Sequence, residues 1–309
     1  MKILILGKTG QISWDLQRCM PLLGAAVCAG RPEVDFINPD SLRQMVRAVR
    51  PDVLINAAAY TSVDQAESEP ELAMKINGEA PGILAEEMKR IGGLMIHYST
   101  DFVYDGSGTE PWVEESPTAP LNVYGAAKLA GDEAVRAVGG SYLIFRTSWV
   151  YGARGRNFLR TVLRLAQTGE PLRIVDDQIG SPTWSKDIAS ATSFILARLM
   201  SHGESASRHR LSAAAEYSGI YHMSSAGYVS WCGFAGLILE EARRLGVHRG
   251  GTVQLTPIST GEYRAPALRP SNSRLTNARL QTTFGISLPD WRASLRMVIE
   301  DIVGFRSWP

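Results

Sequence analysis

The strongest constraint on the fold is a regular alternation of short apolar segments with longer segments of helical periodicity. The apolar segments cover residues 2–6, 25–29, 53–56, 94–98 and 142–146. Each has the length and composition of a strand buried on both faces of a parallel sheet. The alternation is typical of right-handed βαβ units, so the sequence predicts an α/β fold with a doubly wound, mostly parallel (Rossmann) sheet.

Between and after these strands, apolar spacing and capping residues predict a series of helices. They cover 11–20, a segment from Asn38 to before Pro51, 71–90 with a break near Gly78 or Pro81, 122–138, 157–167, 185–200, 231–245 and a last helix from Asp290. We expect further strands at 172–175 and 220–223.

The alternation becomes less regular after Gly152, which indicates a change of domain. We expect a dinucleotide-binding domain over residues 1–152 and a mainly substrate-binding lobe over 153–309, a smaller C-terminal α/β unit. Residues from about 172 to 200 are expected to return to the first domain. Residues 201–218, rich in Ser, Ala, His and Arg, are interpreted as an exposed insertion.

The overall composition excludes several classes of protein. The net charge of +1 gives no basic field for nucleic acid. The three cysteines, Cys19, Cys28 and Cys232, are scattered and are typical of a reduced, cytoplasmic protein. No apolar run approaches the roughly 18 residues of a membrane span, and the apolar start at residues 1–6 is too short for a secretory signal.

A glycine-rich turn follows the first predicted strand and opens a helix. Gly7 and Gly10 with Ser13 form the pattern G-x-x-G-x-x-S. Glycines at such a turn let backbone N–H groups approach a pyrophosphate at the positive end of the helix. The third glycine of the usual dinucleotide pattern is replaced by small Ser13. We therefore predict a dinucleotide site here, with an ordinary strand–helix turn as the alternative.

The end of the second strand bears on the choice of dinucleotide. An acid at this point binds the adenosine ribose, whereas an arginine pairs with a 2′-phosphate. The sequence there reads Cys28-Ala29-Gly30-Arg31, with no acid. Arg31 favours NADPH, and NADH stays open because Arg31 also fits an ordinary surface position. Asp35 and Phe36 would lie near the adenine.

The candidate reaction centre combines Tyr124 and Lys128 with Thr100. Four residues apart on a helix, the tyrosine and the lysine share one face. An ammonium group beside a phenol lowers the tyrosine pKa, and such a phenol exchanges protons with a carbonyl or hydroxyl oxygen. The Thr100 hydroxyl, at the end of a strand, can bond the same oxygen. This set predicts carbonyl reduction or alcohol oxidation beside a hydride carrier.

Several short motifs spread over nearly the whole chain resemble those of the dTDP-4-dehydrorhamnose reductase family, within the extended short-chain dehydrogenases/reductases. They are Gly7-Lys8-Thr9-Gly10-Gln11, Asn56-Ala57-Ala58-Ala59-Tyr60-Thr61, His97-Tyr98-Ser99-Thr100-Asp101, Pro120-Leu121-Asn122-Val123-Tyr124-Gly125, Phe145-Arg146-Thr147-Ser148-Trp149 and Arg269-Pro270-Ser271-Asn272-Ser273-Arg274.

The resemblance implies NAD(P)H-dependent reduction of the 4-keto group of a dTDP-linked 6-deoxysugar to dTDP-L-rhamnose. It implies that Tyr124 donates the proton, that Lys128 binds the nicotinamide ribose, that Thr100 bonds the reacting oxygen, and that Asp101 and Trp149 contact the sugar. Trp149 also fits an ordinary core position. The residues implied to line the cofactor are Gly7, Thr9, Gly10, Gln11, Ile12, Asp35, Phe36, Ala57, Ala58, Ala59, Tyr60, Thr61 and Tyr98.

Two departures from the family pattern affect metal binding and assembly. Some members hold Mg²⁺ with helix-borne carboxylates at a dimer interface. Asp15 matches one such acid, but Lys186 and Arg292 stand near the places of others. Because cationic side chains do not ligate a hard cation, we predict no metal. A homodimer stays open, without a metal bridge. The second departure is the insertion at 201–218.

Other functions stay open from the sequence. A 4,6-dehydratase needs a second acid after Asp101, where this chain has Phe102. A 4-epimerase would recycle bound NAD. Some proteins that resemble this family serve as non-catalytic, NADP-binding regulatory subunits of a methionine adenosyltransferase, but such a scaffold has no need of Thr100, Tyr124 and Lys128 together. His97 is interpreted as structural.

Overall fold

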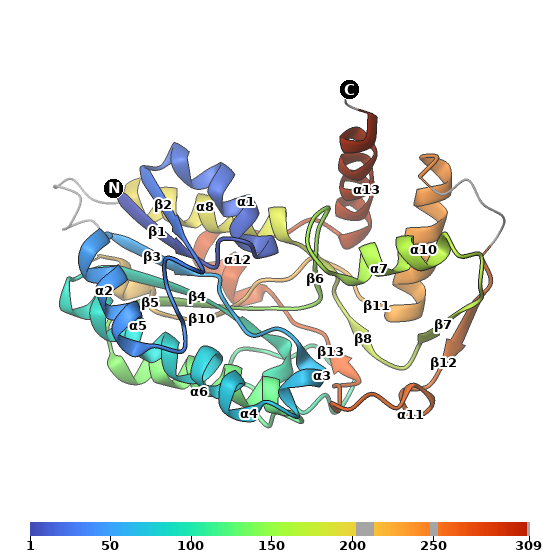
Figure 1. Ribbon diagram of the computed structural model, residues 1–309, viewed down its shortest axis with the longest axis horizontal. Helices are drawn as coiled ribbons and strands as arrows, with labels where there is room; N and C mark the ends of the chain where they lie inside the picture. The colour runs from blue at the N-terminus through green and yellow to red at the C-terminus, as the bar shows by residue number, and fades with distance from the viewer. Residues whose placement is uncertain (202–212, 248–252, 308–309) are drawn as a thin grey trace.

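The computed structural model describes residues 1–201, 213–247 and 253–307. Its larger body is an α/β sandwich built on a six-stranded parallel sheet (Figure 1). The strands, in spatial order, are β10 (Gly219–His222), β5 (Ser141–Thr147), β4 (Leu94–Thr100), β3 (Val53–Asn56), β1 (Lys2–Leu6) and β2 (Ala25–Ala29). The predicted doubly wound sheet is confirmed.

The strand order places the topological switch between β1 and β3. The chain leaves β1 for β2 on one side and then returns to β3 on the other, with Leu6 level with Asn56. In such sheets ligands bind beyond the carboxyl ends of the strands at this switch. The Gly7 turn and the Ala57–Ala59 segment both lie there.

Two helical layers cover the sheet, because alternate residues of its buried strands point to opposite faces. Ile3 and Ile5 pack on one face and Leu4 and Leu6 on the other. The first face carries α1 (Gln11–Cys19), α8 (Ser185–Ser201) and α12 (Ala278–Phe284). The second carries α2 (Pro39–Val49), α5 (Ala80–Arg90) and α6 (Val123–Val138).

The predicted helix over 71–90 is divided into three parts. These are α4 (Pro70–Ala73), a π-helical segment (Met74–Glu79) and α5, preceded by the short α3 (Val63–Ala66). The predicted break thus falls on the residues before Ala80. Asn77 in the π segment is buried and both donates to and accepts from the backbone of Tyr60. The irregular turn therefore fixes a segment at the ligand edge of the sheet.

A smaller lobe lies beside the sandwich (Figure 1). It has its own apolar core. Its helices are α7 (Phe158–Ala166), α10 (Trp231–Arg244), α11 (Thr260–Tyr263) and α13 (Trp291–Ser307). Its short strands are β6 (Val150–Tyr151), β7 (Leu172–Val175), β8 (Ile179–Gly180), β9 (Thr183–Trp184), β11 (Val229–Ser230), β12 (Leu255–Ile258) and β13 (Asn272–Ser273). In the described residues no helix is both long and apolar enough to cross a bilayer.

The chain returns to the large sheet later than the sequence predicts. The strand at Leu172–Val175 pairs with β12 of the smaller lobe, so the return begins with α8 at Ser185. More of the C-terminal part of the chain joins the large sandwich than predicted, because β10 and α12 also belong to it. Most of the predicted insertion at 201–218 lies outside the described residues, and residues 213–217 form a 3₁₀ helix.

Candidate active site

Gly7 brings the first turn against the backbone that follows β3. Its φ of +99° is a conformation that glycine adopts readily. A Cβ at this position would lie 2.7 Å from the backbone nitrogen of Ala58. Gly10 then precedes α1, whose free N–H groups face the same edge. The geometry of the turn is compatible with the pyrophosphate cradle that the glycine pattern predicts.

The side chains that follow this turn link it to the smaller lobe. The Gln11 side chain accepts from Asn157 Nδ2 at 2.7 Å and donates to the Val150 carbonyl at 3.5 Å. Ile12 packs against the core below, whereas Thr9 is exposed. Asn157, which sequence reasoning missed as a functional residue, also caps α7.

The end of β2 carries an ion pair that the sequence did not predict. Lys8 Nζ lies 2.7 Å from Glu33 Oε1, and this contact raises the pKa of Lys8 and lowers the pKa of Glu33. Gly30 is needed here because a Cβ would lie 2.9 Å from Lys8 Cβ. Arg31, next to Gly30 in the chain, is exposed.

The other predicted cofactor residues lie on three segments at this edge. Asp35 is exposed and its carboxylate accepts from the Ile37 backbone, whereas the Phe36 ring packs into the core. Ala57 and Ala58 are half-buried beside the Gly7 turn, and Ala59 is exposed.

The last of these segments, Tyr60 and Thr61, lies beside the π-helical segment and α4. The Tyr60 hydroxyl donates to Glu69 at 2.8 Å, and Thr61 is exposed. Glu69 and Asn77, which hold Tyr60, carry no sequence signal that marks them as site residues.

Tyr98 contributes to the site through its backbone. Its ring is buried beside Phe145, and its hydroxyl is 2.8 Å from Thr192 Oγ1. Its carbonyl oxygen, at the end of β4, accepts from Lys128 Nζ at 2.6 Å.

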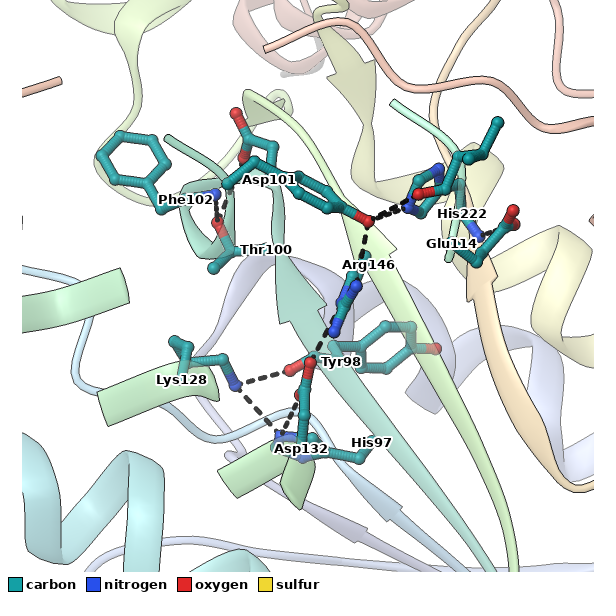
Figure 2. Close-up of polar contacts among 12 residues, drawn as sticks. His97, Tyr98, Thr100, Asp101, Phe102, Glu114, Lys128, Asp132, Arg146 and His222 are labelled. Atoms are coloured by element: carbon teal, nitrogen blue, oxygen red, sulfur yellow. Dashed lines mark hydrogen bonds and ion pairs between the residues drawn. The ribbon is translucent and has the colours of Figure 1, made fainter. Parts of the chain in front are cut away.

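Thr100 ends β4, Asp101 begins the short 3₁₀ turn that follows, and both lie near Tyr124. The Thr100 hydroxyl donates to Asp101 Oδ1 at 3.1 Å and accepts from the Phe102 backbone (Figure 2). The Tyr124 ring packs edge-on against Phe102, with ring centroids 5.6 Å apart. The structure therefore brings together the hydroxyl and the phenol that the sequence singled out.

The pKa of Tyr124 runs against the sequence expectation that Lys128 lowers it. Burial raises the pKa of Tyr124 to about 12; a side-chain hydrogen bond with Thr100 opposes this, and the Asp101 and Asp132 carboxyl groups add to it. Lys128 is not among the groups that shift the pKa of Tyr124 in this structure; its ammonium group contacts the Tyr98 carbonyl and His97 on β4 instead. At neutral pH the phenol is therefore protonated and can donate a proton.

Lys128 is itself buried, and burial lowers its pKa to about 8, opposed by Asp132. Asp132 in turn bonds Arg146, whose Nε lies 3.1 Å from Asp132 Oδ2. The network continues through the Tyr104 hydroxyl, which accepts from Arg146 Nη1 at 2.9 Å and lies 2.7 Å from His222 Nε2. Figure 2 shows Asp132, Arg146 and His222 of this network. The sequence did not single out this buried network.

Asp101 and Trp149 lie on the side of the smaller lobe. Asp101 Oδ2 accepts from Ser148, which also donates to the Ser273 carbonyl. Burial raises the pKa of Asp101 to about 6, opposed by hydrogen bonds from Ser273 and Thr100. Trp149 stacks on Trp231 with centroids 3.5 Å apart. Half-buried Trp149 thus joins the sheet to α10.

The residues considered for a metal are engaged in other contacts. Asp15 accepts from Ser185 at 2.6 Å, Lys186 Nζ lies 4.0 Å from Asp301, and Arg292 pairs with Asp290. Within residues 1–201, 213–247 and 253–307, no cluster of three or more His, Cys, Asp or Glu side chains is placed to hold a metal. The absence of a metal stays a prediction.

The parallel sheet with its glycine turn and the Thr100, Tyr124 and Lys128 set define an extended short-chain dehydrogenase/reductase. The family model described as the RmlD substrate binding domain matches residues 1–303. The chain belongs to the dTDP-4-dehydrorhamnose reductase family.

Full-length relatives agree with this assignment. The chain is 48% identical over 304 residues to the dTDP-4-dehydrorhamnose reductase of Burkholderia thailandensis, covering 98% of this chain and 99% of the relative. It is 40% identical over 306 residues to that of Escherichia coli strain K12, covering 98% of each chain. The crystal structure of the Bacillus anthracis dTDP-4-dehydrorhamnose reductase in complex with NADP matches with a TM-score of 0.85 and 32% identity, covering 97% of this chain and 99% of the other.

Proposed function

We propose that this protein catalyses the NADPH-dependent reduction of the 4-keto group of dTDP-4-dehydro-L-rhamnose, which gives dTDP-L-rhamnose. The observation that carries the proposal is the placement of a protonated Tyr124 phenol beside the Thr100 hydroxyl at the carboxyl end of β4. Relatives named dTDP-4-dehydrorhamnose reductase cover nearly the whole chain, which supports this substrate.

The residues present fit a dinucleotide. A Cβ would fill the cradle at Gly7, and α1 begins directly behind it. Gly7, Gly10 and Gln11 would hold the pyrophosphate, Arg31 the 2′-phosphate, and Lys128 the nicotinamide ribose. The bound dinucleotide supplies a hydride to the ketone carbon. The complex of the Bacillus anthracis enzyme with NADP supports NADPH as this dinucleotide.

Residues of the chain itself supply the proton for the reduction. As the ketone carbon gains the hydride, its oxygen becomes an alkoxide, and Tyr124 passes its phenolic proton to that oxygen. By turning its O–H from Asp101 Oδ1 to the same oxygen, Thr100 can donate a hydrogen bond that stabilises the developing charge. Asp101 and Trp149 would orient the sugar from the side of the smaller lobe.

The test is NADPH consumption, followed by absorbance, with dTDP-4-dehydro-L-rhamnose as substrate. We expect stoichiometric oxidation with the wild type and a loss of about 100-fold or more in kcat for Tyr124→Phe. Tyr263→Phe, which changes a half-exposed tyrosine far along the chain, is the matched control. A 4-epimerase would isomerise a nucleotide sugar without net NADPH consumption, and a regulatory subunit would bind NADPH without turning over the sugar.

We also propose that the enzyme works in the cytoplasm and that it is a homodimer. The free Cys19, Cys28 and Cys232 support a reducing compartment. Light scattering of the purified protein, with and without EDTA, tests the assembly. A mass of one chain would reject the homodimer, and a dimer that EDTA dissociates would reject the prediction that no metal is bound.

A further inference from the structure

Lys128 reaches its position through contacts with β4. Its Nζ donates to the Tyr98 carbonyl at 2.6 Å and lies 3.2 Å from His97 Nε2 (Figure 2). The whole side chain is only 2% exposed, so water does not replace these partners. The direction of the ammonium group therefore depends on two neighbouring residues of one strand.

The His97 ring is fixed on its other side as well. Its Nδ1 lies 3.2 Å from the side-chain amide of Asn56, and the Asn56 oxygen accepts from the Ala58 backbone at 3.3 Å. Ala58 is the residue whose backbone nitrogen faces Gly7. A chain of polar contacts thus joins the Gly7 turn to Lys128 through one imidazole.

The chemistry of the ring decides what it can do. Burial and the neighbouring Lys128 lower the pKa of His97 well below its usual value, so the imidazole is neutral. A neutral imidazole has one donor nitrogen and one acceptor nitrogen, and an ammonium group only donates. When Lys128 is charged, Nε2 must be the acceptor and Nδ1 must carry the proton. The Asn56 amide must then turn its oxygen toward Nδ1, which exchanges its contact with the Ala58 backbone for one with the ring. When Lys128 is neutral, Nε2 can carry the proton and Nδ1 can accept from the Asn56 Nδ2 group, which faces it in this structure.

We propose that His97 is a positioning residue of the reductase: its Nε2 holds the Lys128 ammonium group against the Tyr98 carbonyl, and its Nδ1 ties that lysine to Asn56. This inference rests on the proposed reductase function. It assigns a role to a histidine that the sequence indicated only as structural.

The other charged groups around this pair come from two elements. Asp132 on α6 has its Oδ1 3.9 Å from His97 Nε2, and it stabilises the charge on Lys128. Arg146 on β5 bonds Asp132 and reduces that effect. Tyr124 shares α6 with Lys128. Because Asp132 and Arg146 stay in place when His97 is changed, a shift in the titration of Lys128 reports the loss of the imidazole acceptor.

Three substitutions of His97 distinguish the roles of its two ring nitrogens. His97→Gln places an amide near Nε2 and keeps a hydrogen-bond partner for Lys128. His97→Asn places its amide near Nδ1, which keeps the Asn56 contact and leaves Lys128 without its second acceptor. His97→Leu removes both.

We expect kcat within about threefold of the wild type for His97→Gln and at least about tenfold lower for His97→Asn and His97→Leu, a part of the 10²–10⁴ that acid–base assistance supplies. The second readout is an NMR titration of ¹³C-labelled lysine without cofactor, with the Lys128 signal assigned by Lys128→Arg. The Lys128 midpoint should fall to lower pH in His97→Asn and His97→Leu and return toward the wild-type value in His97→Gln, because loss of an acceptor disfavours the charged form.

His222→Gln is the matched control, since His222 is equally buried but bonds Tyr104. It should lower thermal stability without moving the Lys128 midpoint. The inference is overturned if Gln and Asn at position 97 lower kcat equally with an unmoved Lys128 midpoint. A wild type that binds NADPH but does not reduce the sugar would reject the proposed function instead, and the NMR titration would still decide the contact between His97 and Lys128.

Discussion

The Cα of Gly7 faces the backbone nitrogen of Ala58 so closely that a Cβ on residue 7 would lie 2.7 Å from it. These two residues lie just after β1 and β3, the strands on either side of the topological switch. The contact explains why the turn needs glycine for its packing as well as for its φ of +99°. It also makes the cofactor cradle sensitive to a single methyl group.

Gly7→Ala should therefore lose both stability and cofactor binding. We expect a melting temperature several degrees lower and NADPH binding weakened by at least about tenfold, since both the backbone conformation and the contact with Ala58 are disturbed. Calorimetry and NADPH fluorescence measure the two effects. Gly169→Ala is the control, because Gly169 has a φ of +73° and open space around its Cα. Equal losses in the two variants would contradict the role of the close contact.

The pH dependence of kcat should show an alkaline limb near pH 8. The pKa of Tyr124 is about 12, so the proton donor stays protonated across the accessible range. The pKa of Lys128 is about 8, and the role proposed for Lys128 at the nicotinamide ribose uses its charged form. Reduction should therefore be fastest below this value and slow as pH rises through it. A rate that is flat from pH 6 to 10 would contradict the requirement for a charged lysine.

Arg31→Ala should change the preference between dinucleotides. Losing a charge-assisted contact with the 2′-phosphate should raise the KM for NADPH by about tenfold and leave that for NADH nearly unchanged. Steady-state kinetics with both dinucleotides measure this. Arg43→Ala, which removes an arginine paired with Asp40 on α2, is the control. If NADPH affinity is the same in both variants, Arg31 has no part in the preference.

The Asp132–Arg146 pair should show strong coupling in folding. Asp132→Asn leaves a guanidinium group buried without its carboxylate, which typically costs about 3–5 kcal/mol. Arg146→Met leaves the opposite charge unpaired and should cost a similar amount. The double variant should cost less than the sum, and urea unfolding of all four proteins gives the coupling energy. Additive losses would mean that the two side chains do not stabilise one another.

The sequence by itself predicted the parallel sheet and the glycine turn after its first strand, and it singled out Thr100, Tyr124 and Lys128 as candidate reacting groups. A run such as Ile3–Leu6, short, apolar and followed directly by Gly7, predicts a buried strand. The glycine pattern and the Tyr124–Lys128 spacing are likewise local features of the chain. These features can be recognised without knowing which distant residues will be neighbours, because they depend only on local periodicity and turn chemistry.

Only the tertiary structure decided where Lys128 points and what surrounds it. Helical spacing places Lys128 beside Tyr124 on one helix face, but in the folded protein its ammonium group contacts the Tyr98 carbonyl and His97. Burial raises the pKa of the Tyr124 phenol. The Trp149–Trp231 stack likewise joins two residues far apart in the chain. The contact of Tyr60 with Asn77 depends on a π-helical segment that the sequence did not predict. Desolvation and long-range packing set such contacts and pKa values, and a linear sequence does not show which atoms will share a buried environment.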